Sequence, residues 1–256
     1  MRVSKMSLQP LFVKMRNCPG ISSPGALDLL KLMAVAAMLV DHINTLFLHP
    51  PAPELYALGR MAFPLFVLVW AINAGQRPER LQRRANRLWG WALLTQPVFV
   101  FAFREQQPWY ALNILFVFAA ATQLLALRHR YGLPGVTAGT GLLALLVIPL
   151  MPASYGIQGI VPSLSLATFF AARTGRMQVL SAAAAVISLI ILNGSAHLFS
   201  RPLDTLTVAV LPTLVLPVAA VITAGSLQPA SFPRFLPGRF FYVMYVLHLL
   251  VLGCFV

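Results

Sequence analysis

The chain has 256 residues, of which 59% are hydrophobic and only 10% are charged. About a quarter of the residues in soluble proteins are charged, so this chain has too few to cover a surface that faces water. Its 19 Lys and Arg outnumber its 6 Asp and Glu and give a net charge of +13, but these cations fall in short clusters between apolar runs. That distribution is typical of membrane loops and argues against nucleic acid as a partner.

The apolar runs predict the fold. A helix needs about 20 mostly apolar residues to cross a bilayer, and Pro, Gly and Arg separate segments of roughly that length here. The predicted spans are residues 27–48, 55–75, 88–104, 110–127, 134–151, 157–172, 178–197, 206–225 and 239–255. We therefore expect an all-α, polytopic transmembrane helix bundle of about nine spans over residues 27–256.

The N-terminal segment, residues 1–26, contains four basic residues but no continuous apolar stretch before Pro24. This pattern does not predict a cleavable signal peptide, so the first span is expected to be a retained anchor. The two cysteines, Cys18 and Cys254, lie near opposite ends of the chain. We expect both to be free thiols, with no disulfide and no metal site.

The loops predict the orientation. If residues 1–26 are cytoplasmic, Lys and Arg should gather in alternate loops on that side. Sixteen of the 19 basic residues do so: Arg2, Lys5, Lys14, Arg16, Lys31, Arg77, Arg80, Arg83, Arg84, Arg87, Arg128, Arg130, Arg173, Arg176, Arg234 and Arg239. Only Arg104 and Arg201 fall on the other side, and Arg60 lies inside the second span. This predicts a multi-pass protein of the bacterial inner membrane with its C-terminus outside.

Ionisable residues inside the predicted spans are few, and each is costly. A charge at the centre of a bilayer costs about 2.5–3.5 kcal/mol on insertion scales, so such residues are usually paired or functional. Asp41 and His42 lie about 21 Å along the first span at 1.5 Å per residue. Arg60 reaches a similar depth from the other side of the membrane. An Asp41–Arg60 ion pair is therefore expected.

Other polar residues fall at the same predicted level, namely Asn113 near the outer end of the fourth span, Tyr155 before the sixth, and His248 in the last span. We expect these side chains to form one buried polar site open to the outside. A structural role is the competing interpretation, because an intramembrane Asp–Arg pair often holds two helices together and a single His often packs by one hydrogen bond.

The loop at residues 76–88 carries five arginines. Its simplest interpretation is a topology determinant that also touches anionic membrane lipid. The alternative is a cradle for the phosphates of a nucleotide-like cofactor, because the guanidinium fork matches phosphate oxygens. Arg83, Arg84 and Arg87 are the candidates for that role.

Several motifs follow one another in a specific order and spacing. From about Gly25 on, the first are Leu39-Val40-Asp41-His42-Ile43-Asn44 and Gly59-Arg60-Met61-Ala62-Phe63-Pro64-Leu65-Phe66. The later ones are Asn86-Arg87-Leu88-Trp89, Asn113-Ile114-Leu115-Phe116, Ser154-Tyr155-Gly156-Ile157, Pro233-Arg234-Phe235 and His248-Leu249. Taken together, these motifs resemble the TraX family of conjugative-plasmid membrane proteins, whose F-plasmid member acetylates the N-terminus of pilin. Ser154 and Val246 stand where many relatives look to have Asp and Pro.

This resemblance implies an integral membrane N-acetyltransferase within the transmembrane acyltransferase group. It would transfer acetyl from acetyl-CoA to the N-terminal amine of a conjugative pilin subunit or a similar small membrane peptide. The arginine-rich loop would meet the CoA phosphates, and the polar cluster would meet the acceptor.

N-acetylation needs a base for the ammonium proton and a donor or cation for the oxyanion. His titrates near neutral pH, so we expect His42 to be the base, with His248 as the competing base. Asp41 would orient His42 or balance Arg60, while Arg60, Asn113 and Tyr155 would stabilise or bind substrate. Direct transfer and an acetyl-histidine intermediate both remain open.

Two other functional classes fit the composition: a transporter, and a structural membrane subunit of a conjugation or secretion apparatus. Transporters often show inverted repeats and broken helices in corresponding halves, and the sequence shows no such symmetry. A structural subunit needs no intramembrane His or Asp.

Overall fold

The computed structural model describes residues 23–76, 78–194, 199–227 and 233–256. The N-terminal segment, with Cys18, lies almost entirely outside these residues, as does Arg77. The principal helices are α3 (Pro24–Phe47), α4 (Pro53–Gly59), α5 (Ala62–Gln76), α6 (Leu81–Ala102), α7 (Leu115–Tyr131), α8 (Leu133–Ser154), α9 (Gly156–Ala171), α10 (Gly175–Gly194), α12 (Leu211–Leu227) and α13 (Phe240–Gly253). Short helical segments are η1 (Pro78–Arg80), α11 (Pro202–Asp204) and the π-helical η2 (Thr205–Val210).

Over these described ranges the chain is helical and contains no strand, so the predicted all-α class is confirmed. Four continuous helical stretches are long and apolar enough to cross a membrane: Pro53–Gly75, Leu133–Ser154, Gly175–Asn193 and Pro202–Leu227. The apolar helices α9 and α13 are shorter. Each predicted span coincides with one helix or one helical stretch, although α3 and α6 also carry several charged residues.

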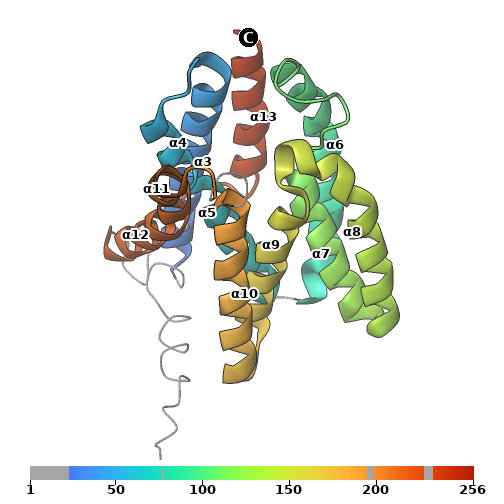
Figure 1. The fold of residues 1–256 in the computed structure, drawn as a ribbon. Coiled ribbons are helices and arrows are strands. Elements are labelled where there is room, and N and C mark those ends of the chain that lie inside the picture. The colour runs from blue at the N-terminus through green and yellow to red at the C-terminus, as the bar shows by residue number, and fades with distance from the viewer. Residues whose placement is uncertain (1–22, 77, 195–198, 228–232) are drawn as a thin grey trace, which may run out of the picture.

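The helices form one bundle around a continuous apolar core (Figure 1). Helices α3, α5, α6, α7 and α13 pack against one another at its centre, and Leu30, Leu65, Val117 and Leu249 are fully buried there. Helix α8 packs on α7, and α10 packs on α9. Their outer faces expose large apolar side chains such as Leu145, which suits a lipid environment.

The bundle has two distinct ends. Helices α3, α6, α10 and α13 begin at the end where α7 finishes, and the C-terminus lies at the opposite end (Figure 1). The first end carries most of the described cations, including Lys31, Arg84, Arg128 and Arg234. We call it the basic end. The grouping agrees with the loop alternation seen in the sequence.

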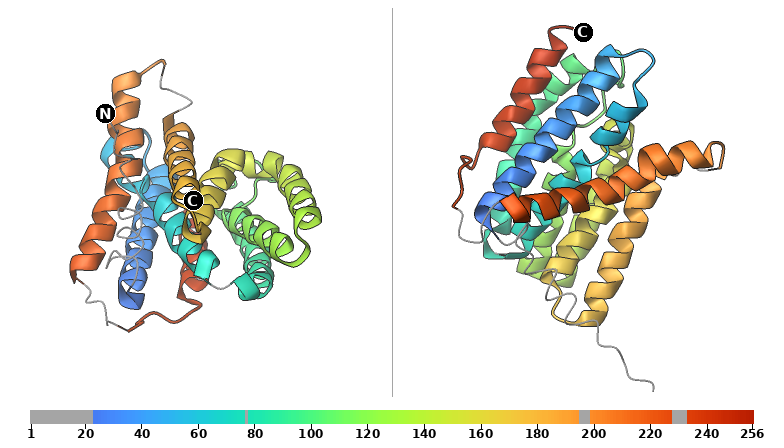
Figure 2. Two further views of the ribbon diagram at one scale, coloured as in Figure 1. Left: turned by 90° about the horizontal axis from the view of Figure 1, so that it is seen from below. Right: turned by 90° about the vertical axis from the view of Figure 1, so that its left-hand side faces the viewer.

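The continuous stretch Pro202–Leu227 departs from the upright arrangement. It runs obliquely across α3, as the right-hand view of Figure 2 shows, and α12 packs on both α3 and α10. Its 26 residues span about 39 Å at 1.5 Å per residue, longer than the roughly 30 Å hydrocarbon core. A helix of this length can tilt strongly and remain within the bilayer.

Candidate functional site

The junction between α4 and α5 in the second span positions the central ion pair. Helix α4 ends at Gly59, and α5 begins at Ala62, so Arg60 sits at the junction. Its guanidinium Nη2 donates to Asp41 Oδ1 at 2.6 Å. A Cβ atom at Gly59 would lie only 2.4 Å from the same carboxylate oxygen. Glycine is therefore required for α3 and α4 to come this close, and the ion pair expected from the sequence is present.

Arg60 has further partners that the sequence did not single out. Its Nη1 donates to Asn193 Oδ1 at 3.1 Å, and Asn193 Nδ2 donates to Thr213 Oγ1 at 2.6 Å. The guanidinium also lies 4.2 Å from the centre of the Tyr56 ring. These contacts join α10 and α12 to the ion pair. A lone amide at the end of an apolar helix, as at Asn193, was the available signal.

The two intramembrane histidines are in direct contact, although they are 206 residues apart. His42 Nδ1 lies 2.8 Å from His248 Nε2, and His248 Nδ1 lies 2.9 Å from the carbonyl oxygen of Met244. The two rings are nearly parallel, with centroids 5.0 Å apart. The His42 and Phe103 rings also meet in a T-shaped contact, with centroids 5.2 Å apart.

These distances fix the proton positions when both rings are neutral. A carbonyl can only accept, so the proton of His248 sits on Nδ1 and its Nε2 is an acceptor. His42 Nδ1 must then carry its proton and donate to His248. This leaves Nε2 of His42 unprotonated and able to take a proton. The two hydrogen bonds that link the Met244 carbonyl, His248 and His42 orient His42, much as a third group orients the base in nucleophile–base pairs.

A cavity of about 160 Å³, here called the histidine cavity, lies beside this pair. Among the described residues its wall includes Asp41, His42, Thr45 and Gln107, together with aromatic rings from four elements: Phe63, Phe66, Phe99, Phe103, Tyr155 and Tyr245. His248 and Arg60 do not line it. His42 is therefore the histidine that faces the space, while His248 stands behind it.

Tyr155 reaches the histidine cavity from the turn between α8 and α9. Its backbone is left-handed, with φ 63° and ψ 3°, which is uncommon for a residue other than glycine. Its ring centroid lies 5.1 Å from that of Phe63. A costly backbone conformation that points an aromatic ring into a cavity is typical of a functional position.

Asn113 lies apart from the cavity. It is fully buried, and its amide nitrogen donates to Ala92 O and to Gln96 Oε1, both at 2.9 Å. Its Oδ1 accepts the backbone N–H of Leu115 at 3.0 Å. The side chain thus ties α6 to the start of α7 and lines neither cavity described here. Its geometry is that of a helix-capping residue.

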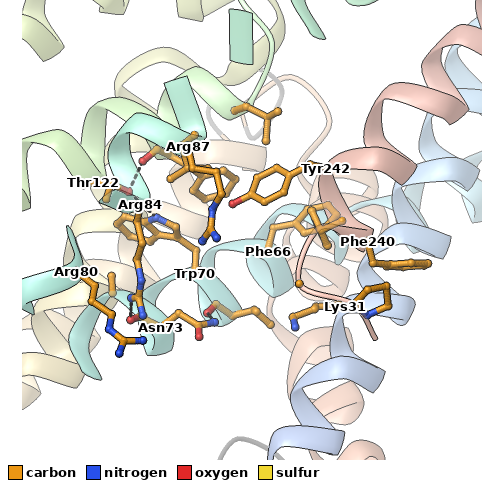
Figure 3. Close-up of a pocket in the computed structure, with 18 of the residues that line it drawn as sticks. Lys31, Phe66, Trp70, Asn73, Arg80, Arg84, Arg87, Thr122, Phe240 and Tyr242 are labelled. Carbon is orange, nitrogen blue, oxygen red and sulfur yellow. Dashed lines mark hydrogen bonds between the residues drawn. The ribbon is translucent and has the colours of Figure 1, made fainter. Parts of the chain in front are cut away.

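A second and larger cavity, of about 590 Å³, opens at the basic end and is here called the basic cavity (Figure 3). Its described lining contains five cations and no Asp or Glu; the cations are Lys31, Arg80, Arg84, Arg87 and Arg234. They come from α3, η1, the first turns of α6 and the loop before α13. In Figure 3, Lys31 approaches from the side opposite Arg80 and Arg84, while Arg87 points toward the centre.

The inner wall of the basic cavity is aromatic. Trp70 is fixed by its Nε1, which donates to Thr122 Oγ1 at 2.9 Å. Tyr242 stacks on Trp91 with ring centroids 5.3 Å apart, and Arg87 lies 5.8 Å from the Tyr242 ring. A ring of cations in front of flat aromatic faces fits a ligand with phosphates and a base, because Arg binds phosphate oxygens and bases stack on aromatic rings.

The three arginines expected to bind a cofactor lie differently from one another. Arg84 and Arg87 line the basic cavity, whereas Arg83 is exposed and does not. Arg80, which the sequence did not single out, takes a place in the wall. Positions 80, 84 and 87 follow the i, i+4, i+7 spacing of one helix face, and position 83 lies at the edge of that face. The Arg84 guanidinium also donates to the carbonyl of Asn73.

A buried carboxylate organises the rim of the basic cavity. Asp28 is fully buried on α3, and its Oδ2 accepts the backbone N–H groups of Phe235 and Leu236 at 3.1 and 3.0 Å. Its Oδ1 pairs with Lys31 Nζ at 2.6 Å. Asp28 therefore holds both Lys31 and the loop before α13 beside the cavity. No local sequence pattern predicts this role for Asp28.

Comparisons with known proteins cover nearly the whole described chain. The family model for TraX, described as "TraX protein", matches residues 26–256. A "Protein TraX" of Escherichia coli is 39% identical over 234 residues, covering 90% of this chain and 87% of that protein. "Protein TraX" of Escherichia coli strain K12 is 39% identical over 233 residues, with the same coverage. No solved structure matches. A match of this extent and identity shows that the chain belongs to the TraX family.

Proposed function

We propose that this membrane protein is an N-acetyltransferase that takes acetyl from cytoplasmic acetyl-CoA and delivers it to the N-terminal amine of a pilin or similar small membrane peptide. One observation carries the proposal. The basic cavity and the histidine cavity lie next to each other and share the side chain of Phe66. A donor with phosphates and a base suits the first cavity, and a proton acceptor borders the second.

The proposed orientation follows the charges. The basic end faces the cytoplasm of a bacterial cell, where Lys and Arg accumulate in inner-membrane proteins. The residues suited to hold CoA phosphates are Lys31, Arg80, Arg84, Arg87 and Arg234. The histidine cavity then lies toward the periplasm, from which the N-terminus of a membrane peptide reaches it.

Acetyl-CoA, when bound, supplies an acetyl thioester. In direct transfer the acceptor nitrogen forms a bond to the carbonyl carbon, the C–S bond breaks, and CoA leaves as its thiol. The ammonium nitrogen loses two protons in all, and the Nε2 of His42 takes them in turn; one passes to the departing thiolate and the other is released to water, so protons balance. His248 holds His42 in the required tautomer through the 2.8 Å contact.

Other groups have supporting roles in this mechanism. Tyr155 lines the histidine cavity and is the proposed donor to the oxyanion that forms on the carbonyl. Asp41 also lines the cavity, and Arg60 holds its carboxylate at 2.6 Å. The pair fixes α3 against α4, and so it positions His42, the residue after Asp41. The internal contacts of Asn113 argue against a role for it in substrate binding.

The proposal is tested by measuring acyl transfer directly. Purified protein in liposomes is given radiolabelled acetyl-CoA and a pilin-like peptide with either a free or a blocked N-terminus. Label should appear only on the free amine, and His42→Ala should slow its transfer by about 10²–10⁴-fold without altering membrane insertion. Mass spectrometry of pilin from cells with and without the gene should show a difference of one acetyl group. An unchanged mass together with lost pilus assembly would favour a structural subunit instead.

A further inference from the structure

The two cavities meet at a single aromatic ring. Phe66, on α5, lines both the basic cavity and the histidine cavity. It is 8% exposed, and its ring meets Phe241 in a T-shaped contact with centroids 4.4 Å apart. Phe241 lines the basic cavity. Phe66 therefore borders both spaces and is braced by Phe241 of α13.

The cavities follow each other along the same helices. On α5, Phe63 lines the histidine cavity, Phe66 lines both, and Trp70 lines the basic cavity. On α13 the order is Tyr245 for the histidine cavity and Tyr242, one turn nearer the basic end, for the basic cavity. The spaces are thus two compartments of one path through the bundle, divided at the level of Phe66.

The path has the length that an extended donor needs. Lys31 borders the basic cavity and His42 borders the histidine cavity, and they are about 16 Å apart along α3 at 1.5 Å per residue. Phosphates held by the cations and a thioester placed beside His42 must therefore be joined by a long thin arm. That arm, or the acyl group at its tip, has to pass the Phe66 ring.

From this geometry we infer that Phe66 is the residue that sets which acyl groups the protein transfers. The inference rests on the proposed function and deepens it. The ring bounds the histidine cavity on the side from which the donor arrives, so this space of about 160 Å³ holds a two-carbon acyl group beside the acceptor amine but not a longer chain as well. Removing the ring joins the two spaces and relaxes the limit on chain length.

The first test compares donors of different acyl length. Phe66→Ala should raise kcat/KM for hexanoyl-CoA relative to acetyl-CoA at least tenfold over the parent protein, and Phe66→Leu should give an intermediate ratio. Phe66→Trp should lower kcat for acetyl-CoA with little change in its KM, since the five cations of the basic cavity are unchanged. A ratio that stays constant across all three active variants would overturn the inference.

The second test needs no transferase activity. The natural cysteines are replaced by Cys18→Ser and Cys254→Ser, and one cysteine is placed in the histidine cavity by Ala62→Cys, one helical turn from Phe66 and 7% exposed. A charged thiol reagent is added to vesicles from the side of the basic end. Phe66→Ala should speed labelling at least tenfold. The matched control, Phe99→Ala, removes a ring from the histidine cavity alone and should not.

The two tests separate the possible failures. Labelling that is equally slow with and without the Phe66 ring would show that the division lies elsewhere, and the inference fails even if acetyl transfer occurs. Faster labelling in a protein that transfers no acyl group would leave the divided path in place but remove any acyl selection, and the failure then lies in the proposed function. Faster labelling with a changed donor preference supports both.

Discussion

The histidine pair allows the two candidate bases to be distinguished by substitution. His42 borders the cavity with an unprotonated Nε2, whereas His248 accepts from His42 and donates to Met244 O. His42→Ala removes the proton acceptor itself. General-base catalysis typically contributes about 10²–10⁴-fold to the rate, so kcat for acetyl transfer should fall by about that factor.

Replacing His248 should lower kcat less than replacing His42 does. His248→Leu deletes the acceptor of one hydrogen bond, and such a bond is worth about 0.5–1.5 kcal/mol net. This corresponds to a loss of about 2–10-fold, because 1.36 kcal/mol is a factor of ten in rate. His248→Gln keeps an oxygen that can accept from His42 Nδ1, and it should recover part of that loss.

The assay is single-turnover acetyl transfer to a pilin-like peptide in liposomes, with KM for acetyl-CoA measured in parallel. All three variants should keep a parental KM, since neither histidine lines the basic cavity. The reverse order, in which His248→Leu is nearly inactive and His42→Ala retains most of its rate, would refute the assigned tautomers and make His248 the base.

Further substitutions test other parts of the site. Gly59→Ala places a methyl group 2.4 Å from Asp41 Oδ1, so it should destabilise the protein by about 1–3 kcal/mol in a detergent melting assay. The control Gly90→Ala should leave the stability unchanged, because no atom lies within 4 Å of the added methyl group. Arg84→Gln and Arg87→Gln should each raise KM for acetyl-CoA about 10–100-fold, because a hydrogen bond to a charged group is worth about 1.5–3 kcal/mol. Arg83→Gln, at a position that does not line the basic cavity, should leave this KM unchanged. Asp28→Ala removes the acceptor of the Phe235 and Leu236 N–H groups, so it should raise KM for acetyl-CoA with kcat retained and speed proteolysis of the loop before α13. An Asp28→Ala protein with a parental KM and an equally protected loop would contradict the role given to Asp28.

Much of the architecture followed from the sequence, because lipid imposes a simple rule on length and hydrophobicity. Each predicted apolar span is helical in the structure. Counting residues from the ends of the spans placed Asp41, Arg60 and His248 at a similar depth, and this is why they were expected to lie close together. The Asp41–Arg60 ion pair is present at 2.6 Å. The tilt of Pro202–Leu227 could not be expected, because it comes from packing against α3 and α10 rather than from composition.

The depth of a residue in the membrane does not tell in which direction its side chain points, so the sequence predicted only part of the site. Asn113 lies at the expected level but turns its side chain toward Ala92 and Gln96. Arg83 stands next to Arg84 in the chain, yet it is exposed and does not line the basic cavity. Asp28 and Asn193 were overlooked because their partners, Leu236 and Arg60, are more than 100 residues away and no local pattern links them. The sequence also placed the two histidines at similar depth without indicating that they touch.

The contact between the two cavities at Phe66 also affects how well the membrane resists the flow of ions. If water fills both spaces when the protein sits in a bilayer, the Phe66 ring is the low-dielectric barrier between them, and much of the membrane voltage would fall across it. Moving one elementary charge through that drop costs or yields about 2.3 kcal/mol per 100 mV. The voltage exerts no net force on a neutral acetyl group, but it does act on phosphates, protons and metal ions. A ring at this position would therefore allow the acetyl group to pass while it limits the passage of ions across the membrane.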